Sequence, residues 1–97
     1  MTIDYDGATT LFAIAANEIR LRIMLEIARE ERTVNDLAEA VGMSQSPVSQ
    51  HLAKLRGADL VEWRRDGVNT YYHLRPGVGQ SLIRFSRENF TRPSQTE

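Results

Sequence analysis

Apolar residues recur at helical spacing in five stretches of this chain and alternate with polar residues in two shorter ones. Spacings of three and four residues predict amphipathic helices, whereas alternation predicts β-strands. The helical stretches are residues 8–17, 18–29, 34–41, 44–56 and 78–90, and the alternating stretches are residues 60–64 and 70–74. Residues 1–7 show no period and are expected to form a flexible or loosely docked arm. The pattern predicts one mainly α domain over residues 1–97, with a small β-hairpin, in the order α-α-α-α-β-β-α.

Two of the predicted helices follow one another closely within residues 33–56. Gly42 suits the left-handed position just beyond a helix end. The next helix can begin with Ser44 as its N-cap, or with Ser46 as cap and Pro47 as its first residue. Both registers predict a short helix, a tight turn and a second helix, which is the helix-turn-helix motif.

The second helix of this motif has one narrow apolar stripe, formed by Val48, Leu52 and Leu55. Helical projection places a polar, acid-free set on the opposite side and its flank: Ser46, Ser49, Gln50, Ala53, Lys54 and Arg56. Glutamine and serine can read base edges, and lysine and arginine can hold phosphates or guanine. An ordinary solvated helix face would have similar polarity, so the surrounding elements decide between the two interpretations.

A hairpin is predicted over residues 60–74, directly after this helix. Residues 65–69 join its strands and contain Asp-Gly, which is the strongest short hairpin signal. Arg64, Arg65 and Asn69 lie at or beside the predicted tip. A polar hairpin in this place is typical of a wing that touches the DNA backbone or the minor groove.

The first helix, residues 8–17, is apolar on most of its sides and therefore needs cover on most of them. In a chain of 97 residues a second subunit can supply part of that cover, although a plain core helix fits the same pattern. The last helix, residues 78–90, has an apolar stripe of its own. The residues predicted for a dimer interface are Leu11, Phe12, Ala15, Leu82 and Phe85.

The net charge of −1 is distributed unevenly. Residues 1–43 sum to −4, residues 44–75 to +2 and residues 76–97 to +1, so the basic excess lies around the polar helix. Such a footprint favours a nucleic-acid partner and salt-sensitive binding. Arg20 belongs to the acidic first part and is expected on the wetter side of its helix.

The element order and the short sequence motifs within it resemble those of the ArsR/SmtB family of winged-helix repressors. The matching words are Arg20-Leu21-Arg22-Ile23, Asp36-Leu37-Ala38, Val41 to Ser46, Val48-Ser49-Gln50-His51-Leu52, Leu55-Arg56, Leu60-Val61, Arg64 to Gly67 and Tyr71-Tyr72. The resemblance runs from about residue 11 to residue 74, and its most specific block is SQS-x-VSQHL-x-x-LR. It implies a homodimer, joined through residues 8–29 and 78–90, that binds an imperfect inverted repeat in a promoter and is released by a signal.

Carried over residue by residue, the resemblance also implies particular contacts with double-stranded DNA. The base-reading residues would be Gln45, Ser46, Ser49 and Gln50. The residues nearer phosphates would be Ser44, His51 and Lys54, and the wing contacts would be Arg64 and Arg65. His51 also projects toward the flank of the apolar stripe, so a packed, hydrogen-bonded place at the core edge is an equal alternative.

The sequence departs from the family where many members sense metals. It has no cysteine, which excludes thiolate metal sites and disulfides, and its last helix has Glu88 without any His or Asp. His51 and His73 stand alone in the sequence, and nothing in the spacing favours a site built from Asp4 or Asp6 with a partner-chain histidine. We therefore expect no metal and no cofactor, and the sequence points to no particular small-molecule effector.

The most economical interpretation is a sequence-specific, dimeric transcriptional repressor. A winged-helix module that binds another protein, with only incidental DNA binding, is the alternative. No nucleophile–base pair, glycine-rich phosphate loop or close carboxylate pair indicates an enzyme. The longest apolar run, residues 11–16, is far too short to span a membrane, and no signal peptide is visible, so a cytoplasmic location is expected.

Overall fold

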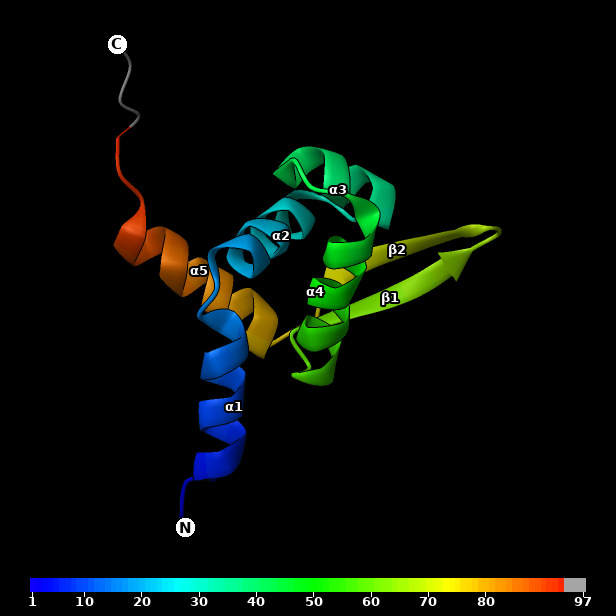
Figure 1. Ribbon diagram of the computed structural model, residues 1–97. Helices are drawn as coiled ribbons and strands as arrows, with labels where there is room; N and C mark the ends of the chain where they lie inside the picture. The colour runs from blue at the N-terminus through cyan, green and yellow to red at the C-terminus, as the bar shows by residue number, and fades with distance from the viewer. Residues whose placement is uncertain (94–97) are drawn as a thin grey trace.

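The computed structural model describes residues 1–93. Its elements are α1 (Tyr5–Ala15), α2 (Glu18–Arg29), α3 (Val34–Val41), α4 (Gln45–Gly57), β1 (Val61–Asp66), β2 (Asn69–Leu74) and α5 (Val78–Phe90). Figure 1 shows α4 between the hairpin, which projects to one side, and α1 with α5, which lie on the other. The predicted element order is confirmed.

The first helix begins earlier than its apolar period indicated. Asp4 is the N-cap of α1 and accepts a hydrogen bond from the backbone N–H of Gly7 at 3.0 Å, so the helix starts at Tyr5. The prediction of an arm was therefore wrong from Tyr5 on, where the capping signal of Asp4 starts a helix, whereas residues 1–4 lie outside any helix and are exposed. Asn17, expected inside the first helix, instead caps α2 by accepting from the N–H of Arg20 at 3.0 Å.

The core is built around α2 and α4. Its fully buried side chains are Ile23, Met24, Leu37, Val48, Leu52, Leu55 and Leu60, each with 0% of its surface exposed. This set includes the whole predicted apolar stripe of α4. Because that stripe is anchored in the core, the polar side of α4 must face outward.

The last helix, α5, packs on the core of its own chain through one face and leaves another face exposed. Gly79 and Ile83 are buried, whereas Val78 and Phe85 are 52% and 58% exposed. The exposure of Phe85 is compatible with its predicted place in a dimer interface, which stays a prediction. A Cβ added at Gly79 would lie 2.4 Å from the backbone oxygen of Leu60, so α5 approaches the chain before β1 closely.

The hairpin has longer arms and a shorter tip than predicted. Asp66 pairs with Asn69, which leaves a two-residue loop whose first residue, Gly67, has φ +64°. Such tight loops match the twist of the paired strands. A backbone bridge between Arg32 and Tyr72, with N···O distances of 2.8 and 3.3 Å, adds a third short segment beside β2.

The domain is flat, with principal extents of 44 × 42 × 21 Å. Within the described residues, every helix is too short or too polar to cross a membrane.

Candidate nucleic-acid interface

The solvent side of α4 carries the residues that were predicted to read bases. Gln45, Ser46, Ser49 and Gln50 are all exposed, as are Ala53, Lys54 and Arg56 further along the helix. No Asp or Glu occurs between residues 45 and 57. The face therefore offers donors and acceptors without a charge that would repel phosphate.

The N-terminus of α4 begins at Ser44, which settles the two registers left open by the sequence. Ser44 is the N-cap, and the alternative with Ser46 as cap is wrong. Pro47 is then the third helical residue and has no N–H for the cap hydroxyl to accept from. Ser44 is exposed and makes no side-chain cap bond, so the first N–H groups of the helix are not capped by its hydroxyl and an anion could bind there.

His51 occupies the core edge of α4 and is tied to a buried arginine. Arg20 is only 8% exposed, so its predicted place on the wetter side of α2 was wrong. Its Nε donates to the carbonyl oxygen of Ile14 at 2.6 Å, and its Nη1 lies 3.3 Å from His51 Nδ1. Because arginine can only donate, Nδ1 accepts and the neutral ring carries its proton on Nε2. The packed position expected for His51 is found, and Nε2 keeps a donor for a further contact.

This arrangement predicts the titration of His51. Partial burial, followed by the charges of Arg20 and Lys54, holds the pKa of His51 below its usual 6.5. The unfolded chain therefore binds this proton more readily, and the fold loses stability as pH falls through and below 6.5. In an NMR titration of the imidazole signals, assigned with His51→Gln, we expect a midpoint below 6.5, moving upward in Lys54→Gln. A midpoint at or above 6.5 would contradict the Arg20–His51 contact.

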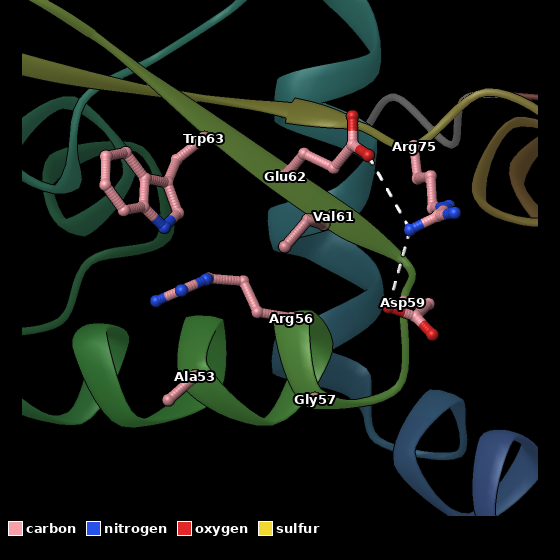
Figure 2. A pocket seen from close by; sticks show the side chains of 8 residues that line it. All are labelled: Ala53, Arg56, Gly57, Asp59, Val61, Glu62, Trp63 and Arg75. Atoms are coloured by element: carbon pink, nitrogen blue, oxygen red, sulfur yellow. Dashed lines mark hydrogen bonds and ion pairs between the residues drawn. The ribbon is translucent and has the colours of Figure 1, made fainter.

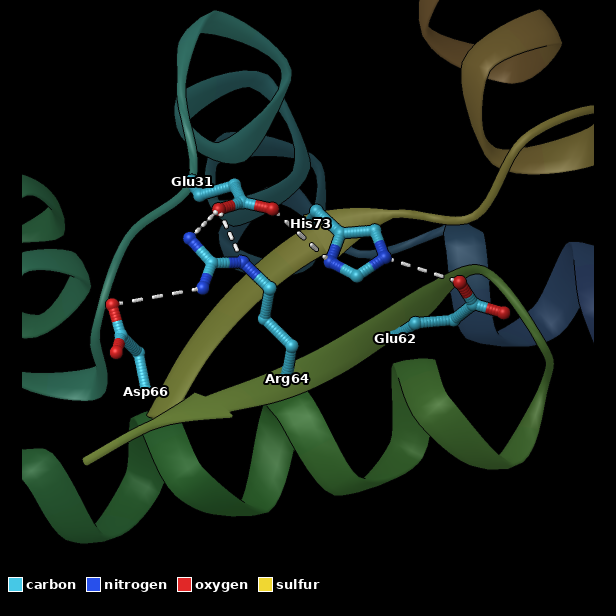
Figure 3. Close-up of polar contacts among 5 residues, drawn as sticks. All are labelled: Glu31, Glu62, Arg64, Asp66 and His73. Atoms are coloured by element: carbon cyan, nitrogen blue, oxygen red, sulfur yellow. Dashed lines mark hydrogen bonds and ion pairs between the residues drawn. The ribbon is translucent and has the colours of Figure 1, made fainter. Parts of the chain in front are cut away.

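On the wing, Arg64 is already engaged by an acid. Its Nη2 and Nε donate to Glu31 Oε1 at 2.6 and 2.8 Å, and its guanidinium lies 5.0 Å from the Tyr71 ring centroid. The Arg64 hydrogen bond lowers the pKa of Glu31, and Glu31 in turn raises the pKa of Arg64. Figure 3 shows this contact beside His73, on the face of the hairpin that carries Arg64. Arg64 thus joins the hairpin to the α2–α3 connection, and a DNA contact by it stays a prediction.

Arg65 and Asn69 lie within the strands and not in the loop where they were predicted. Arg65 shares the other face of β1 with Trp63, and its guanidinium lies 5.7 Å from the Trp63 ring centroid. Arg56 reaches the same ring from α4, at 5.3 Å. Figure 2 shows Arg56 directed toward Trp63 across the space between α4 and β1. Asn69 is exposed, opposite Asp66 at the end of the ladder.

Sequence reasoning missed a charged cluster on the Arg64 face. His73 Nε2 lies 3.1 Å from Glu62 Oε1, and His73 Nδ1 lies 3.6 Å from Glu31 Oε2 (Figure 3). His73 looked isolated because its neighbours come from the opposite strand and from the α2–α3 connection. Across residues 1–93, no three His, Asp or Glu side chains gather in a way that could hold a metal ion.

The residues predicted for a dimer interface divide into two groups. Phe12 and Phe85 are 61% and 58% exposed, and with half-buried Leu11 and Leu82 they line a largely apolar groove of about 700 Å³ between α1 and α5. Ala15 is 7% exposed and packs inside its own chain, so it offers almost no surface to a partner and was wrongly included.

Known proteins share both the sequence and the fold of this chain. A family profile described as bacterial regulatory protein, arsR family, matches residues 17–62. The transcriptional activator HlyU of Vibrio cholerae is 32% identical over 88 residues, which are 91% of this chain and 82% of HlyU. The chain belongs to the ArsR family.

Other ArsR-family relatives extend the comparison. The HTH-type transcriptional regulator KmtR of Mycobacterium tuberculosis is 47% identical over 73 residues, which are 75% of this chain and 56% of KmtR. The chain thus spans little more than half the length of that relative. These proteins are named as transcriptional regulators and not as enzymes.

Solved structures show the same ArsR-type architecture. A structure of HlyU from Vibrio cholerae matches with a TM-score of 0.83 at 31% identity, over 93% of this chain and 98% of that one. The homodimeric winged helix-turn-helix DNA-binding domain of a possible ArsR-family regulator from Mycobacterium bovis matches with a TM-score of 0.81 at 31% identity, over 87% of this chain and 78% of that one. The predicted family and the predicted winged-helix fold are confirmed.

Proposed function

We propose that this chain is a sequence-specific, DNA-binding regulator of transcription that represses a promoter as a homodimer. The observation that carries the proposal is the exposed, acid-free face of α4, presented next to a hairpin that carries Arg64 and Arg65 in an ArsR-family fold. In this proposal Gln45, Ser46, Ser49 and Gln50 contact base edges in the major groove. Phosphate contacts come from Ser44, His51, Lys54, Arg56 and the wing.

The ion pairs support different roles for the two wing arginines. Arg64 has its charge paired with Glu31, whereas Arg65 has no carboxylate within 4.0 Å among residues 1–93. We therefore assign the main phosphate contact of the wing to Arg65 and a supporting role to Arg64.

The homodimer is proposed from the groove between α1 and α5. A contiguous apolar patch that stays exposed on a folded domain marks an interaction surface, and Leu11, Phe12, Leu82 and Phe85 line such a patch here. The Mycobacterium bovis neighbour is described as homodimeric, and two copies of α4 would meet the two halves of an inverted repeat.

Two single substitutions test whether α4 reads sequence while the wing holds backbone. Gln50→Ala should weaken binding to the cognate promoter by roughly 10-fold or more and leave a scrambled duplex nearly unaffected, because a base contact carries sequence information. Arg65→Ala should weaken both duplexes to a similar extent, because a phosphate contact does not. Fluorescence anisotropy on DNA from upstream of the chain's own gene measures both effects.

Glu39→Gln, at an exposed residue of α3, is a control for a small change of a surface side chain. Unchanged cognate affinity in Gln50→Ala would show that the assigned reading face is wrong. Equal wild-type affinity for promoter and scrambled DNA would favour the protein-binding module instead. Run-off transcription decides the direction of control: less transcript supports repression, and more transcript would place this chain with HlyU, which is named an activator.

A further inference from the structure

Trp63 brings together two arginines that come from different DNA-facing elements. Arg56 extends from the last turn of α4, and Arg65 follows Trp63 by two residues on the same face of β1. Their guanidinium carbons lie 5.3 and 5.7 Å from the centroid of the one indole ring. Both distances fall within the range in which an aromatic ring attracts a cation. The ring is 38% exposed, so this cluster lies at the surface.

The charges of this cluster are not neutralised by the protein. Within residues 1–93, neither Arg56 nor Arg65 has a carboxylate within 4.0 Å. The pocket that Arg56 and Trp63 line, about 570 Å³ in volume, contains Arg75 at its other end. Arg75 differs, because Asp59 at 3.5 Å and Glu62 at 3.7 Å pair with it (Figure 2). The unpaired positive charge is therefore concentrated at the Trp63 end, where two like charges would gain from an anion between them.

The second arginine–aromatic contact of the hairpin provides a contrast. Arg64 lies 5.0 Å from the Tyr71 ring centroid on the opposite face, but Glu31 already pairs with its charge. An arginine thus lies over an aromatic ring on both faces of the hairpin, but a carboxylate pairs with the arginine only at Tyr71. Among the arginine–aromatic contacts within residues 1–93, only the Trp63 contact leaves cations available to a phosphate.

We propose that Trp63 is a positioning residue that holds Arg56 and Arg65 as a pair of contacts to one stretch of the DNA phosphate backbone. The inference rests on the proposed function, since it names how that surface engages DNA. Long arginine side chains lose rotamer freedom on binding, and an aromatic ring that orders them beforehand reduces this loss. The pair would act on any sequence, because phosphates are the same along the duplex.

The test is the salt dependence of DNA binding in Trp63→Leu, with Tyr71→Leu as the matched control. Each phosphate contact contributes about 0.9 to the slope of log K against log salt concentration, and slope changes are given per subunit because the proposed homodimer makes each contact twice. We expect Trp63→Leu to flatten this slope by up to about 1.8 and to weaken cognate and scrambled duplexes alike, by roughly 10-fold. Tyr71→Leu should leave the slope unchanged. The phenyl ring of Trp63→Phe attracts cations less strongly than indole, so the salt slope of this variant should lie between those of wild type and Trp63→Leu. If circular dichroism shows that Trp63→Leu is unfolded, Trp63→Phe takes its place.

The coupling between Trp63 and Arg65 gives a second readout. In the wild-type background, Arg65→Ala should flatten the slope by about 0.9, whereas in the Trp63→Leu background it should change the slope little further. Trp63 is the chain's one tryptophan, so its fluorescence reports directly on this place. Duplex binding should change that emission in wild type, and Arg56→Ala with Arg65→Ala should suppress the change.

The outcomes separate this inference from the proposed function. If wild type binds no duplex, the proposed function itself fails. If wild type binds promoter DNA but Trp63→Leu and Trp63→Phe keep its salt slope, the function stands and the role of Trp63 is overturned. A further slope loss of about 0.9 from Arg65→Ala in the Trp63→Leu background would also overturn it, because the arginine would then act without the ring.

Discussion

Replacing Gly79 with alanine should lower the free energy of unfolding by about 3 kcal/mol. The new Cβ would lie 2.4 Å from the backbone oxygen of Leu60, and a backbone atom cannot move aside as a flexible side chain can. Either α5 shifts away from the chain before β1 or that segment distorts. For a domain of this size we expect the melting temperature to fall by roughly 12–24 °C, measured by circular dichroism at a fixed protein concentration.

Gly57→Ala is the matched control. Gly57 is the last residue of α4, its φ is not positive, and an added Cβ would meet nothing within 4 Å. Alanine there should stabilise the fold by about 0.5 kcal/mol, because it restricts the unfolded chain. Similar melting temperatures for the two variants would show that α5 does not approach Leu60 as closely as described.

Replacing Phe85 with glutamate should separate the proposed dimer and lower operator affinity by about 100-fold. Phe85 and Phe12 flank the apolar groove between α1 and α5 and are more than half exposed in the single chain. A carboxylate placed there would be buried without a partner when two copies associate. Two linked half-sites are then bound separately, so the gain from simultaneous binding is lost. Sedimentation equilibrium gives the mass, and anisotropy on the promoter gives the affinity.

Gln80→Glu provides the control, since it adds the same charge to α5 at an exposed residue outside the groove. It should leave the mass of a dimer unchanged. A dimer of undiminished stability in Phe85→Glu would place the contact between subunits elsewhere on the chain.

The sequence predicted those parts of the fold whose signals are local. The bounds of α2 and α5 were predicted to the residue, and Gly42 indeed takes the left-handed position, φ +71°, that ends α3. Asp4 and Asn17 show where this reasoning fell short. Each has a side chain that commonly caps a helix N-terminus, but the helix bounds were predicted from apolar periodicity alone.

The sequence could not predict contacts between side chains that lie far apart along the chain. The sequence predicts Arg20 as a surface residue of α2. In the fold it is buried, in contact with Ile14 of α1 and His51 of α4. His73 meets Glu62 because the two-residue loop sets the register that pairs them. The predicted five-residue turn would pair Glu62 with Tyr72 instead. Trp63 had no predicted role, because one of its two arginines, Arg56, lies on a different element and comes close to the ring only in the folded chain.

The length of the hairpin arms has a consequence for the DNA. Each strand has six residues, which at about 3.3 Å per residue extends roughly 20 Å. A duplex covers the same distance in roughly six base pairs, at about 3.4 Å each. In the proposed complex, wing contacts to phosphates would come in addition to the bases that the exposed residues of α4 contact. An oligonucleotide trimmed to the recognised bases would keep its specificity and lose part of its affinity.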